Sequence, residues 1–192
     1  MILASKSPRR KEILENAGFK LEIIVSDDDE KSDKIDIRSK ILEIAKNKVQ
    51  SIALKYPNRY VLGADTVVIL DEMIIGKPYD EPDAIKTLEK LSGRKHTVLT
   101  GFSFINVSKN IDVSDYEMTQ VFFRYIDDRI IKWYVSTGEP MDKAGSYGIQ
   151  GKGSILIDRI DGDFFNVMGF PIAKFIKKLE KIGIKIDDID KL

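Results

Sequence analysis

A chain of 192 residues, 43% apolar and 32% charged, has enough material for one domain or one compact two-lobed unit. Its 31 Lys and Arg residues balance its 31 Asp and Glu residues, which argues against a general nucleic-acid or membrane-surface binder. The absence of cysteine excludes disulfides, thiol catalysis and cysteine zinc sites, and is compatible with a reducing cytoplasm. The start of the chain is unlike a signal peptide, and no apolar run approaches membrane-spanning length.

The first predicted elements are a buried strand over residues 1–4 and a helix that Ser7 caps and that ends at Gly18. Arg9 and Arg10 lie in the first turn of this helix. The helix dipole and the free N–H groups at that end favour anions, so two cations there suit a bound phosphate. A solvated basic patch is the alternative, but the order strand, Ser, Pro, helix favours an anion site.

An acidic run follows a half-buried strand that the alternation of apolar residues predicts over residues 19–25. Most acidic runs are solvated loops, although carboxylates at a strand end near a phosphate site can hold Mg²⁺. Only one or two of this run could do so, and the sequence leaves open which of them contacts a metal. The candidates are Asp27, Asp28, Asp29 and Glu30.

A long helix is predicted over residues 36–54, because apolar residues recur there at helical spacing. Lys48 lies one turn from Ile44 and one turn from Ile52, in the middle of the apolar stripe. A lysine in that position must extend to solvent or meet an anion. Its position therefore makes Lys48 a candidate anion-binding residue.

The central segment consists of two apolar runs, residues 60–62 and 67–70, on either side of Gly63–Thr66. We interpret it as two strands joined by a bend or bulge. Gly63 would let a ligand or another backbone come close. Asp65 would present a carboxylate from rigid elements, although capping a turn is the commonest role of a lone Asp between strands.

The middle of the chain adds a candidate cation and the single histidine. Lys77 follows a short hairpin strand over residues 73–75 and stands between glycine and proline, which suits either a cation fixed on a phosphate or an ordinary surface loop. His96 begins a long hairpin, with strands over residues 96–107 and 111–123. Without a second histidine it is a poor metal ligand, and we interpret it as a satisfied structural hydrogen bond.

Residues 137–153 form a candidate binding loop, because they are rich in glycine and polar groups. Their spacing does not match a Walker phosphate loop. The tail from residue 185 is charged and expected to be peripheral. The remaining expected elements are helices over residues 80–91, 127–136 and 171–182 and a strand over residues 155–160.

Several motifs occur in a characteristic order. They are Ser5-Lys6-Ser7-Pro8-Arg9-Arg10, Gly63-Ala64-Asp65-Thr66, Gly76-Lys77-Pro78, Leu91-Ser92-Gly93 with His96, Gly138-Glu139-Pro140 with Asp142-Lys143-Ala144-Gly145, and Gly148-Ile149-Gln150-Gly151. With these motifs the chain closely resembles the Maf family of nucleoside triphosphate pyrophosphatases. The likeness covers almost the whole length, including Asn166-Val167-Met168-Gly169-Phe170-Pro171.

The resemblance implies an α/β fold of the Maf/inosine-triphosphatase-like type, an elongated mixed sheet flanked by helices with a central cleft. Residues 1–192 would form this single domain, in two lobes around the cleft. The implied reaction is hydrolysis of a nucleoside triphosphate to the monophosphate and pyrophosphate with a divalent metal, Mg²⁺ or Mn²⁺. The family also implies a cytoplasmic housecleaning enzyme that forms a homodimer, and no nucleic acid or membrane is expected as partner.

The resemblance assigns catalytic roles residue by residue. Asp65 matches the catalytic base and a metal ligand, and Glu30 matches a catalytic or metal-linked acidic position. Lys48 and Lys77 match phosphate-contacting positions of the catalytic machinery.

The resemblance also implies a substrate. Ser5 and Arg9 match phosphate-contacting positions. Arg10, Thr66 and Gln150 match the specificity positions of the branch that acts on dTTP and UTP, whereas the 7-methyl-GTP branch differs at all three.

Two other functions stay open on the sequence. The first is a nucleotide-binding regulator of septum formation without turnover, and the joint presence of Asp65, Glu30 and the lysines argues against it, since a pure binder needs no base. The second is a purine-directed housecleaning enzyme of the inosine-triphosphatase type. Gln150 and Thr66 argue against that function through the resemblance alone.

Overall fold

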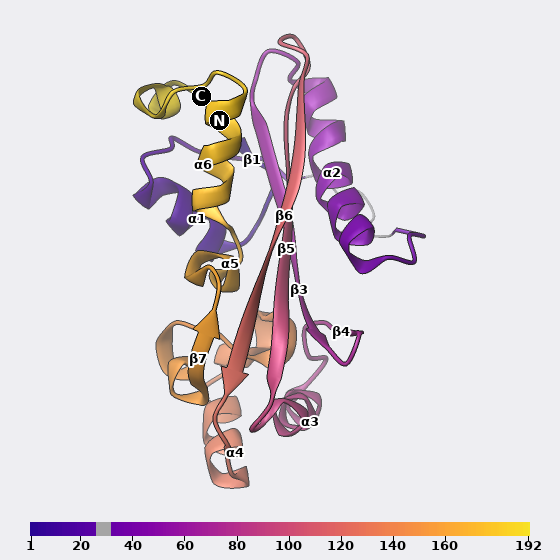
Figure 1. Cartoon of the computed structure of the whole chain (residues 1–192), viewed down its shortest axis with the longest axis vertical. Helices are drawn as coiled ribbons and strands as arrows, with labels where there is room; N and C mark the ends of the chain where they lie inside the picture. Colours follow the sequence, from indigo (N-terminus) through magenta and orange to yellow (C-terminus); the bar gives the residue numbers. More distant parts are fainter. Residues whose placement is uncertain (26–31) are drawn as a thin grey trace. The chain divides into compact units, whose positions relative to one another are not determined.

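The computed structural model describes residues 1–25 and 32–192, which pack into two compact units (Figure 1). The first unit comprises Met1–Asp65, Thr100–Glu117 and Gly169–Leu192. The second unit comprises Thr66–Leu99 and Met118–Met168. The acidic run that includes Glu30 lies outside the described residues.

The described strands form one seven-stranded sheet in the order β2-β1-β3-β5-β6-β7, with β4 paired to β3. Pairing of β1 with both β2 and β3 is parallel, whereas β4 on β3 and β7 on β6 are antiparallel. The sheet is therefore mixed, as the resemblance to the Maf family implies. The strands are β1 (Ile2–Leu3), β2 (Glu22–Ile23), β3 (Val61–Leu70), β4 (Met73–Ile75), β5 (Lys95–Asn106), β6 (Ile111–Phe123) and β7 (Ile157–Asp161).

The predicted helices are confirmed, and side-chain caps explain where most of them begin. Ser7, Asp36, Asp80 and Asp127 each accept a hydrogen bond from a backbone N–H in the first turn, as N-cap residues do. Among the described residues, no helix is both long and apolar enough to cross a membrane. The helices are α1 (Pro8–Asn16), α2 (Ile37–Lys55), α3 (Glu81–Leu91), α4 (Asp128–Ser136), α5 (Phe164–Met168) and α6 (Ile172–Lys181).

In the first unit, helices cover both faces of the sheet. Figure 1 shows α2 on one face and α1 with α6 on the other. Glycines let α2 approach closely: a Cβ on Gly63 of β3 would lie 2.6 Å from Val49 Cγ2, and one on Gly101 of β5 would lie 2.7 Å from Ile41 Cγ2. These distances are far below normal contact, so only glycine fits beneath α2 at both positions.

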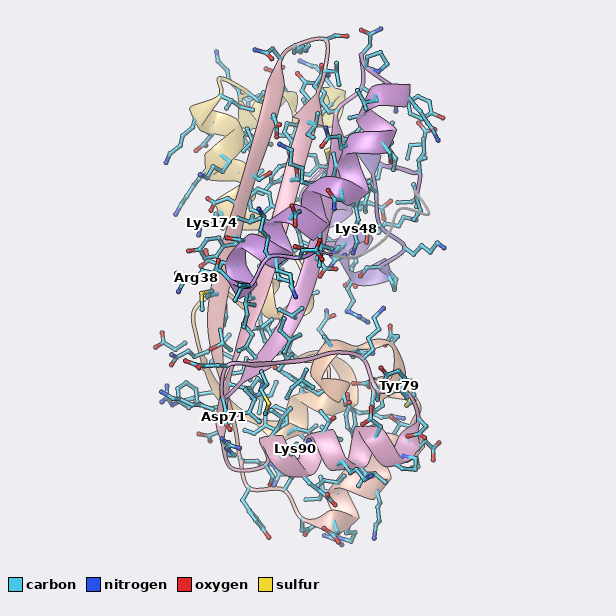
Figure 2. All side chains as sticks on the ribbon, turned by 90° about the vertical axis from the view of Figure 1, so that its right-hand side faces the viewer. Arg38, Lys48, Asp71, Tyr79, Lys90 and Lys174 are labelled. Carbon is cyan, nitrogen blue, oxygen red and sulfur yellow. The ribbon has the colours of Figure 1, made fainter. Side chains whose placement is uncertain are left out.

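The opposite face of the first unit is an aromatic core. Phe175 of α6 packs against Phe102 and Phe104 of β5 with ring centroids 5.6 and 5.4 Å apart. Edge-to-face geometry at such distances is the favourable arrangement for aromatic pairs. At the rim of the unit, Arg38 of α2 and Lys174 of α6, both labelled in Figure 2, lie over the Tyr116 ring of β6.

The second unit has its own hydrophobic core. The helices α3 and α4 contact each other and bury residues such as Leu88 and Tyr134, which are fully inaccessible. Three short 3-10 helices, η1 (Glu139–Asp142), η2 (Ala144–Ser146) and η3 (Gly151–Leu156), occupy the predicted binding loop and its end. The core residues of β3, β6 and the loop join this cluster: Val68, Leu70, Val121, Phe123, Tyr147 and Leu156.

Two predictions for the strands are wrong. The central segment is one continuous strand, β3, because Gly63 makes room for α2 rather than for a bend. The strand predicted over residues 19–25 shrinks to β2, whose Ile23 is 42% exposed at the edge of the sheet. The tail from residue 185 is largely exposed, as predicted, although its 3-10 helix η4 (Ile186–Lys191) buries Ile189.

Candidate functional site

The first unit pairs the two residues that sequence reasoning had singled out separately. Lys48 Nζ of α2 donates to Asp65 Oδ1 of β3 at 2.6 Å, and Figure 2 labels Lys48 on that helix. Their side chains are 15% and 19% exposed, so the pair is sheltered yet reachable from solvent. A charge-assisted hydrogen bond of this length holds both groups firmly. The lysine within the apolar stripe of α2 is thus bonded to a carboxylate.

The N-terminal segment of the first unit supplies a second group of polar side chains. Ser5 Oγ accepts hydrogen bonds from the Ser7 backbone N–H at 3.2 Å and from Arg10 Nη1 at 3.1 Å. Arg10 Nε also donates to the Gly169 carbonyl at 3.0 Å. Ser5 acts as acceptor in both of these bonds, and a hydroxyl that accepts can also donate its own proton. Arg10 is therefore held between the β1–α1 loop and Gly169, while Arg9 lies half-buried in the first turn of α1.

In the second unit, backbone contacts link the segments that carry the other candidates. The Gly145 N–H donates to the Gly76 carbonyl at 2.9 Å, directly before Lys77. A Cβ on Gly145, whose φ is +72°, would lie 2.7 Å from Val68 Cγ2 on β3. The loop is therefore fixed against both β3, near Thr66, and the residue that precedes Lys77. Lys77 itself is exposed, and Gln150 is half-buried.

Glu139 organises the same loop, a role that sequence reasoning did not assign. Its carboxylate accepts hydrogen bonds from the Tyr134 hydroxyl, the Lys152 N–H and the Gly153 N–H, each at 3.0 Å. Burial by itself would raise the pKa of Glu139, but these three donors and nearby Lys143 outweigh it and lower the pKa. The only sequence signal was the place of Glu139 within one of the ordered motifs.

His96 makes a structural hydrogen bond, as predicted, but only one of its two ring nitrogens is satisfied among the described residues. Its Nε2 and the Tyr147 hydroxyl are hydrogen-bonded at 2.7 Å, and its ring meets Phe123 and Tyr147 edge-on. Burial lowers the pKa of His96 to about 4, so the ring is neutral near pH 7. Nδ1 has no hydrogen-bond partner within residues 1–25 and 32–192.

Among the described residues, Asp65 is the carboxylate whose chemistry is compatible with a metal ion shared with a phosphate ligand. The described part of the chain holds no group of three or more His, Asp or Glu side chains arranged for a metal. Mg²⁺ at nucleotide sites commonly takes only one or two protein carboxylates and completes its shell with phosphate oxygens and water. Asp65 offers such a hard oxygen ligand, and Glu30 lies outside the described residues.

The chain is similar to known proteins over nearly its full length. The family model described as "Maf-like protein" matches residues 1–182. A protein named "dTTP/UTP pyrophosphatase" from Fusobacterium nucleatum is 50% identical over 192 residues, all of both chains. One of the same name from Pyrococcus furiosus is 45% identical, over 98% of each chain. The match to a solved dITP/XTP pyrophosphatase from Mycobacterium abscessus covers 95% of this chain and 93% of that chain, at 10% identity and a TM-score of 0.42.

Proposed function

This chain belongs to the Maf family, and from that premise we propose that it hydrolyses dTTP and UTP to the monophosphate and pyrophosphate. The observation that carries the proposal is 50% identity, over the whole of both chains, to a protein named for that activity. The sheltered Lys48–Asp65 pair supports an enzyme rather than a passive nucleotide binder, because catalysis needs a placed carboxylate.

We propose that Asp65 is the general base. It would accept a proton from the water that attacks the α-phosphorus, and the pyrophosphate would depart with the electrons of the broken P–O bond. Lys48 holds Asp65 Oδ1 at 2.6 Å, which orients the carboxylate and leaves Oδ2 to meet the water. A general base in such a position typically contributes about 10²–10⁴-fold to the rate.

The cations are proposed to bind the phosphates. A triphosphate carries roughly four negative charges, so a nucleophile is repelled unless positive groups and hydrogen-bond donors offset that charge. Arg9 and Lys77 would supply positive charge, and the hydroxyl proton of Ser5 would be donated to a phosphate oxygen. These groups would then hold the pyrophosphate until its release.

The base is proposed to be read by Gln150, with Arg10 and Thr66 as further specificity residues. Thymine and uracil each present an acceptor at O4 and a donor at N3, to which an amide is complementary. Cytosine reverses this pattern, but an amide can rotate to match it. Gln150 discriminates only if its orientation is fixed, and a site with fixed polar groups rejects a base that leaves them unpaired.

A divalent metal, Mg²⁺ or Mn²⁺, is proposed to bind between Asp65 and the phosphates, with Glu30 as a further ligand. When bound, it would neutralise charge on the phosphate oxygens. We further propose that residues 1–192 act as one Maf-like domain, that two copies form a homodimer, and that the enzyme works in the cytoplasm on free nucleotides, with neither nucleic acid nor membrane as partner.

The test is a panel of nucleoside triphosphates assayed for pyrophosphate release with Mg²⁺ and with Mn²⁺. We expect dTTP and UTP to be hydrolysed well ahead of ATP, GTP and dCTP. Asp65→Asn should retain nucleotide binding and lose about 10²–10⁴-fold in kcat, whereas Asp158→Asn, an exposed carboxylate on β7, should change neither. A preference for purines, or tight binding without any pyrophosphate release, would contradict the proposal. Near-normal turnover by Asp65→Asn would show that Asp65 is not the general base.

A further inference from the structure

Two glycines, Gly148 and Gly153, lie against each other at the base of the loop that carries Gln150, and we call this contact the neck of the loop. A Cβ on Gly153 would lie 2.3 Å from the Gly148 carbonyl oxygen and 3.0 Å from the Gly148 nitrogen. The backbones of Gly148 and Gly153 thus pack directly on each other, at a distance that no other residue at position 153 would allow. Gln150 stands on the short connection between them.

Both sides of this neck are tied to one pair of side chains. The Tyr134 hydroxyl accepts a hydrogen bond from the Gly148 N–H at 3.1 Å and donates to Glu139 Oε1 at 3.0 Å. Glu139 in turn accepts from the Lys152 and Gly153 N–H groups on the other side. A Cβ on Gly151, whose φ is +64°, would lie 2.9 Å from Glu139 Oε2, so the carboxylate also sits against the loop tip.

Three donors converge on Glu139, and only an ionised carboxylate can accept from all of them without presenting a donor of its own. An amide in its place would turn an NH₂ group toward one of the backbone N–H groups and leave that donor without an acceptor. Where that donor is the N–H of the buried Gly153, leaving it unpaired costs more than the lost bond alone. The chemistry of the site therefore calls for a carboxylate at position 139.

We propose that Glu139 is a positioning residue for nucleotide selectivity. Together with Tyr134 it fixes the Gly148–Gly153 loop and so sets where the Gln150 amide meets the base. This inference rests on the proposed reading of the pyrimidine by Gln150. The Gln150 side chain is presented from one place, because its backbone is anchored two residues before it and two and three residues after it.

The test compares Glu139→Gln with Glu89→Gln, a matched change at an exposed position of α3 in the same unit. Glu139→Gln should lower kcat/KM for dTTP by about 10- to 100-fold, chiefly through KM, because a displaced binding group costs that much. The kcat/KM for dCTP should fall by less than about threefold, so that the ratio of kcat/KM for dTTP to kcat/KM for dCTP decreases. Glu89→Gln should leave both values unchanged.

Amide hydrogen exchange supplies a readout that does not depend on turnover. In Glu139→Gln the Lys152 and Gly153 amides should exchange faster, while amides of β5 keep their protection. Lost protection with an unchanged dTTP-to-dCTP ratio would make Glu139 a merely structural residue and overturn the inference. Unchanged protection would overturn it as well.

A second variant decides the matter if Glu139→Gln does not fold. Tyr134→Phe keeps the ring and removes only the hydroxyl. It should therefore lower the dTTP-to-dCTP ratio of kcat/KM by a smaller factor and make the Gly148 amide exchange faster. Combined with a folded Glu139→Gln, its effect should be less than multiplicative, since both act on one network. A wild type without preference for dTTP and UTP would refute the proposed function together with this inference; a selective wild type whose ratio survives both changes would refute this inference alone.

Discussion

Replacing Gly63 with alanine places a methyl group where α2 lies against β3. The new Cβ would stand 2.6 Å from Val49 Cγ2 and 3.4 Å from the Ala45 carbonyl oxygen. Ordinary contact begins near 3.4 Å, so the contact with Val49 is about 0.8 Å too short. Val49 is fully buried and its branched side chain has little rotamer freedom, so α2 must move away from the sheet.

Overpacking of this kind costs about 1–3 kcal/mol of unfolding free energy. Replacing glycine by alanine returns about 0.4–1 kcal/mol through the unfolded chain. We therefore expect a net loss of about 1–2 kcal/mol, which for a chain of this length lowers Tm by roughly 2–8 °C. Gly76→Ala is the control for stability, because its Cβ would meet nothing within 4 Å and its Tm should not fall.

The same shift should reach the proposed catalytic pair. Lys48 neighbours Val49 on α2, and Asp65 lies two residues beyond Gly63 on β3, so moving the helix lengthens the 2.6 Å contact between their charges. A displacement approaching 1 Å can cost up to about 10²-fold in rate. Pyrophosphate release from dTTP should therefore fall more steeply than a 1–2 kcal/mol loss of stability alone would explain.

Val49→Ala supplies the decisive comparison, since it removes the methyl groups that clash. The double variant Gly63→Ala/Val49→Ala should be more stable than the sum of the two single changes predicts, by about 0.5–3 kcal/mol. It should also regain activity relative to Gly63→Ala. If Gly63→Ala matches the wild type in Tm and rate, or if Val49→Ala fails to relieve it, the close approach of α2 does not set the position of Lys48.

Two further outcomes follow from single groups. Lys48→Met should lower the free energy of unfolding by about 1–3 kcal/mol in denaturant unfolding, because Asp65 loses its ammonium partner. Adding Asp65→Asn should restore part of that loss. A double variant no more stable than Lys48→Met would contradict this expectation. The folded-state pKa of His96, about 4, lies below its unfolded value near 6.5, so the unfolded chain binds more protons between these pH values and stability falls as pH drops through that window. The loss should be on the order of 3 kcal/mol in the wild type and absent in His96→Gln, as Tm against pH would show; equal slopes for both proteins would contradict it.

The sequence by itself determined those features that depend on neighbouring residues, namely the helix bounds and the family motifs. The helices were predicted close to their observed bounds because a capping Ser or Asp and a helical apolar period lie within one segment. The chain's membership of the Maf family was predicted in the same way, from short motifs in a fixed order. The anion-binding and substrate roles of Arg9, Lys77 and Gln150 stay predictions.

Contacts between distant segments were decided only by the tertiary structure. Lys48 and Asp65 were each singled out from the sequence, but their direct bond joins residues 17 positions apart and depends on the packing of α2 over Gly63. That packing also turned a predicted bend into the unbroken strand β3. Glu139 escaped notice because its partners, the backbone N–H groups of Lys152 and Gly153, lie 13 and 14 residues further on. The backbone N–H is the same in every residue except proline, so no pattern of side chains could reveal which carboxylate it meets.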